Sequence, residues 1–429
     1  MSVADVLRPV VRSWLGEEPP VRLLFWDGSS LGPEGGPFGG PYGATSTVAV
    51  RSPDALRRLI YAPNELGLGR AYVAGELDVQ GSMFDALSLR DALAPPDRDA
   101  DLSLGLSDRL RILRAAAAVG ALGRPLPPPP QEARLSGRMH SRGRDADAIA
   151  HHYDVGNDFY RLILGETMTY SCAYFASDGM SLDDAQRAKY ELICRKLGLE
   201  SGMRLLDVGC GWGGMAMHAA QRYDVRAVGI TLSRPQHDLA AKRVAEAGLA
   251  DRVEIRLQDY RDVHDGPFDA ISSIGMFEHV GLSQLGNYFA DLSEVLVPGG
   301  RLLNHGISKP PGPSSFHRNS FVSRYVFPDG ELHEVGSVVS EMQRRGFEVR
   351  DVESLREHYA RTLRCWVANL ESSWDRAVEL AGTARARIWR LYMAASALGF
   401  EAGRINIHHV LGVRPGPAGA SGMPPTRRW

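Results

Sequence analysis

Short apolar segments alternate with longer amphipathic segments through the C-terminal two thirds of the chain. The apolar segments are rich in aliphatic side chains, which is typical of buried strands. We expect strands at Met203–Val208, Val225–Thr231, Val253–Leu257, Phe268–Ile274 and Arg301–Ile307, and helices at residues 183–196, 214–222, 234–247 and 282–296. This repetition predicts an α/β fold with a doubly wound, mostly parallel sheet, whose ligand site lies beyond the carboxyl ends of the strands.

Two further strand candidates follow at Phe347–Val352 and Ile405–Val413. Between them, Thr362–Leu398 has helical periodicity with a break near Gly382, because glycine is a weak helix former. We therefore expect long helices before the last strand.

Residues 1–121 show a different pattern and are expected to form a smaller α+β domain. Val21–Trp26 and Thr45–Arg51 are strand candidates, and the Gly/Pro-rich residues between them exclude regular structure. Helices are expected at Pro53–Ile60, with Ser52 as the N-cap, and at Leu104–Val119.

Residues 122–145 are expected to be a linker to a second domain at 146–429. Four successive prolines exclude a helix there. The linker also carries four arginines, namely Arg134, Arg138, Arg142 and Arg144. These are either solvated linker charges or contacts for anionic lipid headgroups.

Composition narrows the partners and the compartment. The net charge of −2 gives no electrostatic reason to bind nucleic acid. The four cysteines show no metal-ligand spacing, so no metal is expected, and they fit a reducing compartment. Neither a run of ~20 apolar residues nor a secretory pattern is found, so we expect a cytoplasmic protein. Four of the 49 basic residues are lysines, a bias typical of a GC-rich genome: Lys189, Lys196, Lys242 and Lys309.

The sequence LLDVGCGWGG at residues 205–214 joins a strand to a helix through a glycine-rich turn. Gly209, Gly211 and Gly213 permit positive φ and let a ligand approach the backbone closely. Asp207 precedes the first glycine, where a carboxylate suits the cationic amino acid end of S-adenosylmethionine better than a pyrophosphate. The alternative is an ordinary strand–turn–helix corner.

Polar residues also end the next two strands. Thr231 stands where many dinucleotide folds place a ribose-binding carboxylate, and Ser233 nearby is also a good N-cap. Gln258–Tyr260 offers hydrogen-bonding groups and a ring for an adenine. The alternative for Asp259 is turn formation.

The last two parallel strands end in residues that suit proton transfer. Glu278–His279 follows one strand, and His305 interrupts the other near its carboxyl end. A lone histidine is usually structural, but this placement favours a functional role near the reacting centre.

Eight motifs occur in order along the chain: HHYDVGNDFY (151–160), MTYSCAYF (168–175), LLDVGCGWGG (205–214), GITLS (229–233), LQDYRD (257–262), GMFEHVG (275–281), FPDGEL (327–332) and HYARTL (358–363). With them, the region from Ala146 to about Val413 resembles the cyclopropane-fatty-acyl-phospholipid synthase family. That family includes mycolic acid cyclopropane synthases and enzymes that form methylene- and methyl-branched stearoyl lipids.

The resemblance implies a Rossmann-like class I methyltransferase fold with helical lipid-binding insertions, and S-adenosylmethionine as cofactor. The implied cofactor residues are Tyr170, Ser171, Asp207, Gly209, Gly211, Gly213, Thr231, Leu232, Gln236, Gln258, Asp259 and Tyr260. The family also holds bicarbonate in its active site. The implied ligands here are Cys172, Glu278, His305, Ile307 through its backbone, and Tyr359.

The resemblance further implies transfer of a one-carbon unit to the cis double bond of an oleoyl-type phospholipid chain, through a carbocation. Tyr325, Phe316 and Trp366 are candidates to face that cation, with core packing as the alternative for each. The expected product is a 10-methylene-stearoyl-type branched chain, made beside a separate flavin-dependent reductase. A cyclopropane ring is the alternative product.

Two other classes of function stay open from the sequence. One is a non-catalytic lipid-carrier or regulatory subunit, which the intact catalytic candidates argue against. The other is a small-molecule methyltransferase, which the FPDGEL segment and the helices after Tyr359 argue against. We expect peripheral contact with the inner face of the membrane, and the sequence is compatible with an oligomer.

Overall fold

The computed structural model describes residues 1–17, 19, 21–33, 46–87, 106–133, 143–144, 155–312 and 320–429. The chain groups into two compact units. The smaller unit is Met1–Ala133 together with α13 (Phe321–Tyr325) and the part of α17 (Thr383–Glu401) up to Ala395. The domains expected from the sequence, at 1–121 and 146–429, are each one continuous segment. In the structure, the smaller unit also includes residues 122–133 and two segments from the C-terminal part of the chain.

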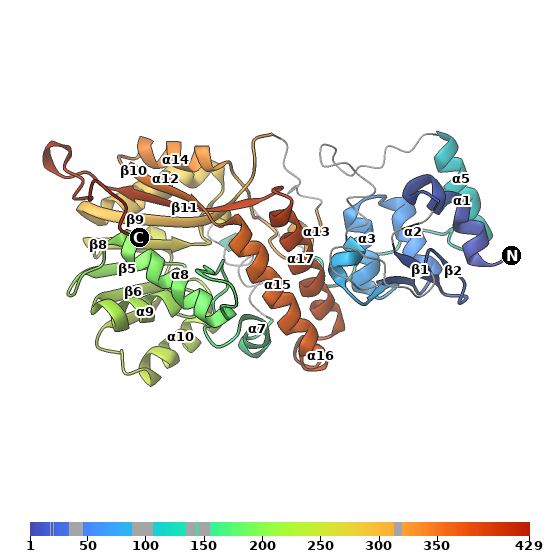
Figure 1. The fold of residues 1–429 in the computed structure, drawn as a ribbon, viewed down its shortest axis with the longest axis horizontal. Helices are drawn as coiled ribbons and strands as arrows, with labels where there is room; N and C mark the ends of the chain where they lie inside the picture. The colour runs from blue at the N-terminus through green and yellow to red at the C-terminus, as the bar shows by residue number, and fades with distance from the viewer. Residues whose placement is uncertain are drawn as a thin grey trace. The chain divides into compact units, whose positions relative to one another are not determined.

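The larger unit is built on a seven-stranded sheet with the order β10-β11-β9-β8-β5-β6-β7 (Figure 1). The strands are β5 (Arg204–Val208), β6 (Arg226–Thr231), β7 (Val253–Leu257), β8 (Phe268–Ile274), β9 (Leu296–Ser308), β10 (Glu348–Ser354) and β11 (Asn406–Val413). The five strands from β9 to β7 are parallel, and β11 runs antiparallel to both of its neighbours. The expected doubly wound sheet is therefore confirmed, and its strand order reverses between β5 and β8.

Helices cover both faces of this sheet (Figure 1). On one face lie α8 (Leu182–Leu197), α9 (Gly214–Tyr223) and α10 (Arg234–Glu246), and on the other lie α12 (Leu282–Glu294) and α14 (Val335–Arg344). The strand residues alternate between the two cores, as the pleat requires. Leu205 and Leu303 pack with α8 and α9, whereas Leu206 and Leu302 pack with α12 and α14.

Four of the remaining elements of the larger unit lie at the carboxyl ends of the strands, namely α7 (Asn157–Leu164), η1 (Tyr260–Asp262), α11 (Phe277–Val280) and α15 (Arg356–Ser372). Helix α16 (Trp374–Ala381) follows α15, and η2 (Pro417–Gly419) follows β11 beside the amino end of β9. The expected helix break at Gly382 is confirmed by its positive φ of 79°. A second break, at Ser373, was not predicted.

The smaller unit contains a four-stranded sheet with the order β2-β1-β3-β4. Its elements are α1 (Val3–Leu15), β1 (Arg22–Phe25), β2 (Ser30–Leu31), β3 (Thr47–Val50), α2 (Pro53–Tyr61), α3 (Glu65–Ala74), β4 (Leu77–Gln80) and α5 (Leu106–Ala118). Ser52 caps α2, as expected. The sequence reading missed α1, which contains Pro9, and α3, which contains two glycines, because both residue types lower helix propensity.

One of those glycines has a packing reason. A Cβ on Gly69 would lie 2.3 Å from the ring of Phe321 in the same unit, so a side chain there would collide with the ring. Tyr325, on the same short helix as Phe321, donates its hydroxyl to Glu132 at 3.2 Å. Tyr325 is therefore part of the smaller unit's packing, which favours the core-packing reading of this residue. Phe316 lies outside the described residues.

The arginine-rich linker is described only at residues 143 and 144. Arg144 forms a two-bond ion pair with the buried carboxylate of Asp329, at 2.5 and 2.8 Å. This engagement corrects both readings of Arg144 as a solvated charge or a headgroup contact. Arg134, Arg138 and Arg142 lie outside the described residues.

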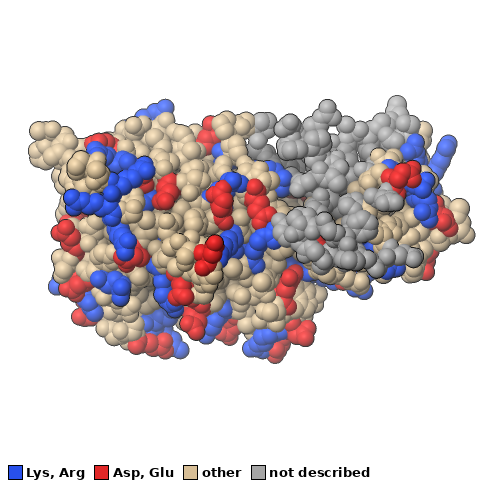
Figure 2. Space-filling view, viewed as in Figure 1, with Lys and Arg blue, Asp and Glu red and all other residues tan. Residues whose placement is uncertain are grey.

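Two further features concern the surface charge and the hydropathy of the helices. On the face of the larger unit drawn in Figure 2, basic and acidic side chains are interspersed. Within the described part of the chain, no helix combines the length and apolar character needed to cross a membrane.

Candidate active site

A cavity with about 950 Å³ of free space, its open mouth included, lies at the carboxyl ends of β5, β6 and β8. The expected cofactor residues that line it are Tyr170, Ser171, Asp207, Gly209, Gly211, Thr231, Leu232, Gln236, Gln258 and Tyr260. Gly213 and Asp259 do not line it. Because the strand order reverses at this point, the cavity occupies the position where doubly wound sheets bind their ligands.

Asp207 presents a half-satisfied carboxylate to this cavity. Its Oδ1 accepts a hydrogen bond from Ser272 Oγ at 2.7 Å, and its Oδ2 is buried without a partner among the described residues. Burial raises the pKa of Asp207 to about 6. A bound cation would favour the ionised form, so this carboxylate suits an ammonium group.

The glycine-rich turn needs its glycines for conformation and for space. Gly209, Gly211 and Gly213 have φ of 74°, 54° and 79°, in the left-handed region. A Cβ on Gly209 would also lie 2.4 Å from the Met276 sulfur. Gly213 acts as the N-cap of α9, which explains why it belongs to the turn without lining the cavity.

The end of β6 is organised by side chains of the chain itself. Thr231 Oγ1 donates to Gln236 Oε1 at 2.9 Å and accepts from the Ser233 amide at 3.1 Å. Ser233 caps α10 by accepting from the backbone of Gln236. Thr231 and Gln236 line the cavity, whereas Ser233 has the structural role that was its alternative.

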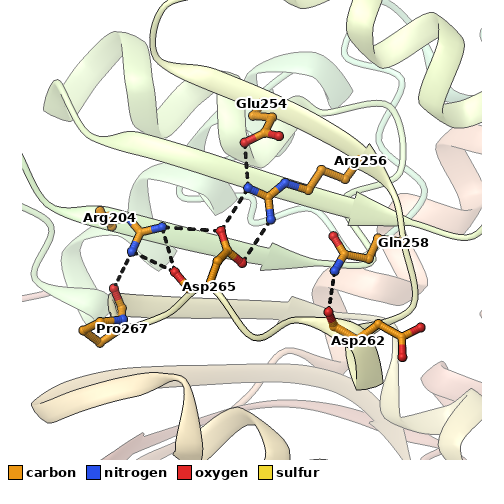
Figure 3. Close-up of polar contacts among 7 residues, drawn as sticks. All are labelled: Arg204, Glu254, Arg256, Gln258, Asp262, Asp265 and Pro267. Carbon is orange, nitrogen blue, oxygen red and sulfur yellow. Dashed lines mark hydrogen bonds and ion pairs between the residues drawn. The ribbon is translucent and has the colours of Figure 1, made fainter.

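The turn after β7 holds its shape through two side chains. Gln258 donates to the carbonyl of Asp262 at 2.7 Å, next to the ion pairs of Arg256 and Asp265 (Figure 3). Asp259 caps η1 and pairs with Arg261 at 2.6 Å. Since Asp259 does not line the cavity, the turn-forming reading describes it better than the adenine contact.

Aromatic rings form one wall beside Ser171. Tyr170 stacks on Trp366 of α15 with ring centroids 5.3 Å apart, and Tyr359 meets Trp366 edge-on at 5.9 Å. Trp366 is fully buried and is not among the cavity-lining residues, so Tyr170 stands between it and the cavity.

Lys189 is a cavity residue that the sequence reading missed. It is fully buried on α8, donates to Ser171 Oγ at 3.0 Å and lies 4.2 Å from the centroid of the Tyr190 ring. Burial lowers the pKa of Lys189 to about 7. The available signal was the scarcity of lysine in an arginine-rich chain, combined with its position among apolar residues of a helix.

Glu278, on α11 after β8, meets Ile307 near the carboxyl end of β9. The backbone N–H of Ile307 donates to Glu278 Oε1 at 2.7 Å. Glu278 Oε2 is buried and has no partner among the described residues, and burial raises the pKa of Glu278 to about 7. This carboxyl group is therefore balanced between its two protonation states near neutral pH.

His305 lies on β9 and is 1% exposed. Within the described residues, neither ring nitrogen has a hydrogen-bond partner. Burial, with smaller contributions from Lys189 and Lys196, lowers the pKa of His305 well below its usual value. The imidazole is thus neutral, and both of its ring nitrogens are open to a hydrogen-bonding ligand.

Cys172 is completely buried and points its sulfur at the carbonyl of Ala173, 3.2 Å away. Burial raises the pKa of the thiol far above its usual range. Cys172 therefore acts as a neutral donor and not as a thiolate nucleophile. Tyr359 lies on α15 and is 5% exposed.

Comparison with known proteins adds an independent line of evidence. Residues 140–410 match the family model described as mycolic acid cyclopropane synthetase. The chain is 42% identical to a "Probable fatty acid methyltransferase" of Mycobacterium tuberculosis, over 100% of this chain and 98% of that protein. It is 34% identical to the tuberculostearic acid methyltransferase UfaA1 of the same organism, over 93% and 88%.

A solved structure of the mycolic acid cyclopropane synthase CmaA1, complexed with SAH and CTAB, is also similar. It is 36% identical, has a TM-score of 0.60, and covers 62% of this chain and 97% of its own.

Proposed function

The chain belongs to the mycolic acid cyclopropane synthetase family of S-adenosylmethionine-dependent methyltransferases, and from that premise we propose that it transfers a one-carbon unit to the cis double bond of an unsaturated phospholipid acyl chain. The expected family, class I fold and enzyme class are confirmed. The main observation that supports this proposal is that Asp207 and Glu278 each have one buried carboxylate oxygen without a partner among the described residues.

The residues of the cavity fit S-adenosylmethionine. Asp207 offers a free carboxylate oxygen to the ammonium group, and the positive-φ turn leaves room for close backbone approach at Gly211. Gln258 and Tyr260 stand at the wall where we place the adenine. When bound, S-adenosylmethionine supplies an electrophilic methyl group.

The second group of residues fits a small hydrogen-bonding anion. Glu278 Oε2 and both ring nitrogens of His305 are buried without partners among the described residues, and Cys172 is a neutral thiol. The backbone N–H of Ile307 contributes by holding Glu278 in place. Bicarbonate, when bound there, supplies a base of suitable pKa.

Dependence on carbonate tests the anion directly. Removing carbonate from the buffer should slow the wild-type enzyme at least tenfold, and adding it back should restore the rate. Full turnover in a carbonate-free preparation would contradict the anion and point to Glu278 itself as the base.

The chemistry proceeds on the lipid. The π electrons of the double bond form a new bond to the methyl carbon as the bond from that carbon to sulfur breaks. The electron pair of the broken bond stays on sulfur, and the acyl chain is left with a positive charge. One C–H bond then breaks, its electron pair closes a ring or a double bond, and the proton leaves. Glu278 and His305 would hold the anion that takes this proton, because both have buried polar atoms without partners among the described residues. The ring of Tyr170 lines the cavity and is available to the cation.

We propose a 10-methylene-stearoyl-type product, which a separate flavin-dependent reductase would reduce. A hydride shift along the chain followed by proton loss from the transferred carbon gives this methylene branch. The similarity to a tuberculostearic acid methyltransferase supports this branch of the family. Ring closure to a cyclopropane is the alternative, which the family description supports.

Lipid analysis of a bacterial host expressing the chain tests the activity. Feeding methyl-labelled methionine should place label in the acyl chains of its phospholipids. The methylene and cyclopropane products have the same mass, so proton NMR must distinguish the exocyclic methylene from ring hydrogens. Unlabelled acyl chains would refute the proposal and favour a non-catalytic lipid carrier.

We also propose that the enzyme reaches its lipid as a peripheral protein at the inner face of the membrane. Because Arg144 is paired with Asp329, the candidate headgroup contacts reduce to Arg134, Arg138 and Arg142. Co-sedimentation with anionic vesicles should weaken at high salt and on replacing these three arginines by glutamine. Binding that ignores salt would contradict the basic-linker contact.

A further inference from the structure

A row of buried ionisable groups leaves the catalytic centre and crosses the sheet under α8. His305 on β9 lies directly opposite His409 on β11, and their ring centroids are 4.5 Å apart. His409 in turn lies directly opposite Glu353 on β10. The row therefore runs across three adjacent strands on one face of the sheet.

His409 has no structural explanation in its surroundings. It is 0% exposed, and neither ring nitrogen has a hydrogen-bond partner among the described residues. Leaving a buried polar group unpaired destabilises the fold. His408, the next residue, differs because its Nδ1 lies 2.9 Å from Ser308 Oγ.

The outer end of the row reaches solvent. Glu353 pairs with Lys196 at 2.5 Å, and its side chain is 35% exposed. Lys196 also pairs with the buried carboxylate of Asp351 at 2.8 Å. Glu353 thus stands opposite His409 on β10, the strand at the edge of the sheet, with its carboxylate held by Lys196.

Two lysines of α8 lie above the row. Lys189 and Lys196 are seven residues apart on the same helical face, and both are 0% exposed. They are two of only four lysines in the chain. Their ammonium groups disfavour a stable positive charge on either imidazole, and His358 on α15 acts on His409 in the same direction.

We propose that His409 is a positioning residue that takes the reaction's proton from His305 and passes it toward Glu353. This inference rests on the proposed function, which releases one proton per turnover into a buried site. One imidazole nitrogen binds the arriving proton while the other releases one, so each ring returns to neutral. No other reactant is consumed.

The test compares three variants of the full chain. His409→Gln should lower kcat at least tenfold and leave the Kd for S-adenosylmethionine within twofold. His408→Gln, on the same strand, should keep the wild-type kcat. In His409→Ala, added imidazole should restore turnover, whereas pyrazole, of the same size but far less basic, should not.

Each other outcome overturns the relay. Wild-type kcat in His409→Gln would do so. A loss in His409→Ala that both compounds or neither compound restores would show that His409 only fills space. If the wild type itself forms no modified lipid, the proposed function fails and the relay fails with it, which separates the two failures.

Discussion

The cofactor end and the proton-handling end of the site differ in how far their polar groups are satisfied by the chain itself. At the cofactor end, Ser272 holds Asp207, and Gln236 holds Thr231. Asp207 and Glu278 each keep one buried oxygen without a partner, but at the other end both ring nitrogens of His305 and of His409 also lack partners among the described residues. A site that binds is fixed in advance by its own hydrogen bonds, whereas a site that moves protons keeps acceptors open.

If the two ends have these different roles, a substitution at the proton-handling end should lower turnover without weakening cofactor binding. Glu278→Gln should show the largest such loss of turnover. We expect kcat to fall about 100- to 10,000-fold, the usual contribution of a proton-transferring group. The Kd for S-adenosylmethionine should stay within twofold, because Glu278 does not line the cofactor cavity. Labelled-lipid formation and calorimetry measure the two quantities, with the exposed Glu294→Gln as control. If kcat and the affinity for S-adenosylmethionine fell by the same factor, the distinction between the two ends would be wrong.

Asp207→Ala should show the opposite pattern. We expect the Kd for S-adenosylmethionine to rise at least tenfold, or ~1.4 kcal/mol, because the free carboxylate oxygen faces the cavity. At saturating S-adenosylmethionine, much of the turnover should return. Asp238→Ala, on the exposed side of α10, is the matched control. An unchanged Kd would contradict the assignment of Asp207 as a cofactor-binding residue.

The same contrast explains what the sequence could predict. The cofactor loop was found because Asp207 and its glycines are consecutive and the strands around them have regular patterns. Gly213 and Asp259 belong to the expected motifs but shape turns, since a motif does not show where each side chain points. Helices α1 and α3 were not predicted, because the proline of α1 and the glycines of α3 lower helix propensity and are accommodated by packing in the folded chain.

The proton-handling end was predictable only in part. Glu278 and His305 came from their positions at the ends of strands, whereas Ile307 came from the family resemblance. The bond between Glu278 and Ile307 joins residues 29 positions apart. His409 and Lys189 were missed because only the pairing of β9 with β11 and the packing of α8 give them their roles. Nothing local in the sequence marks such long-range pairs.

Lys189 lies between the two ends, so its titration sharpens the comparison. Its pKa is near 10.5 in the unfolded chain and about 7 in the fold. Between these values the unfolded chain binds more protons, so this group makes the wild type more stable as pH rises from about 7. The stability of Lys189→Met relative to wild type should therefore be highest near pH 6.5 and decline toward pH 8.5, by up to about 1.4 kcal/mol per pH unit.

Urea denaturation across that range measures the effect. Lys242→Met is the control, because the Lys242 side chain is 68% exposed. Parallel stability curves for wild type and Lys189→Met would show that Lys189 keeps an ordinary pKa in the fold.

Ser233→Ala should have the smallest effect of these substitutions, and it tests the helix cap at the cofactor end. Ser233 is 5% exposed and caps α10, and it does not line the cavity. Loss of an N-cap costs about 1 kcal/mol of unfolding free energy, so the variant should unfold at lower urea with the Kd for S-adenosylmethionine within twofold. Ser233→Asp should recover most of the stability, because aspartate is also a good cap. A weaker Kd at unchanged stability would instead make Ser233 a cofactor contact, and the cofactor end would then depend on more than the side chains that line its cavity.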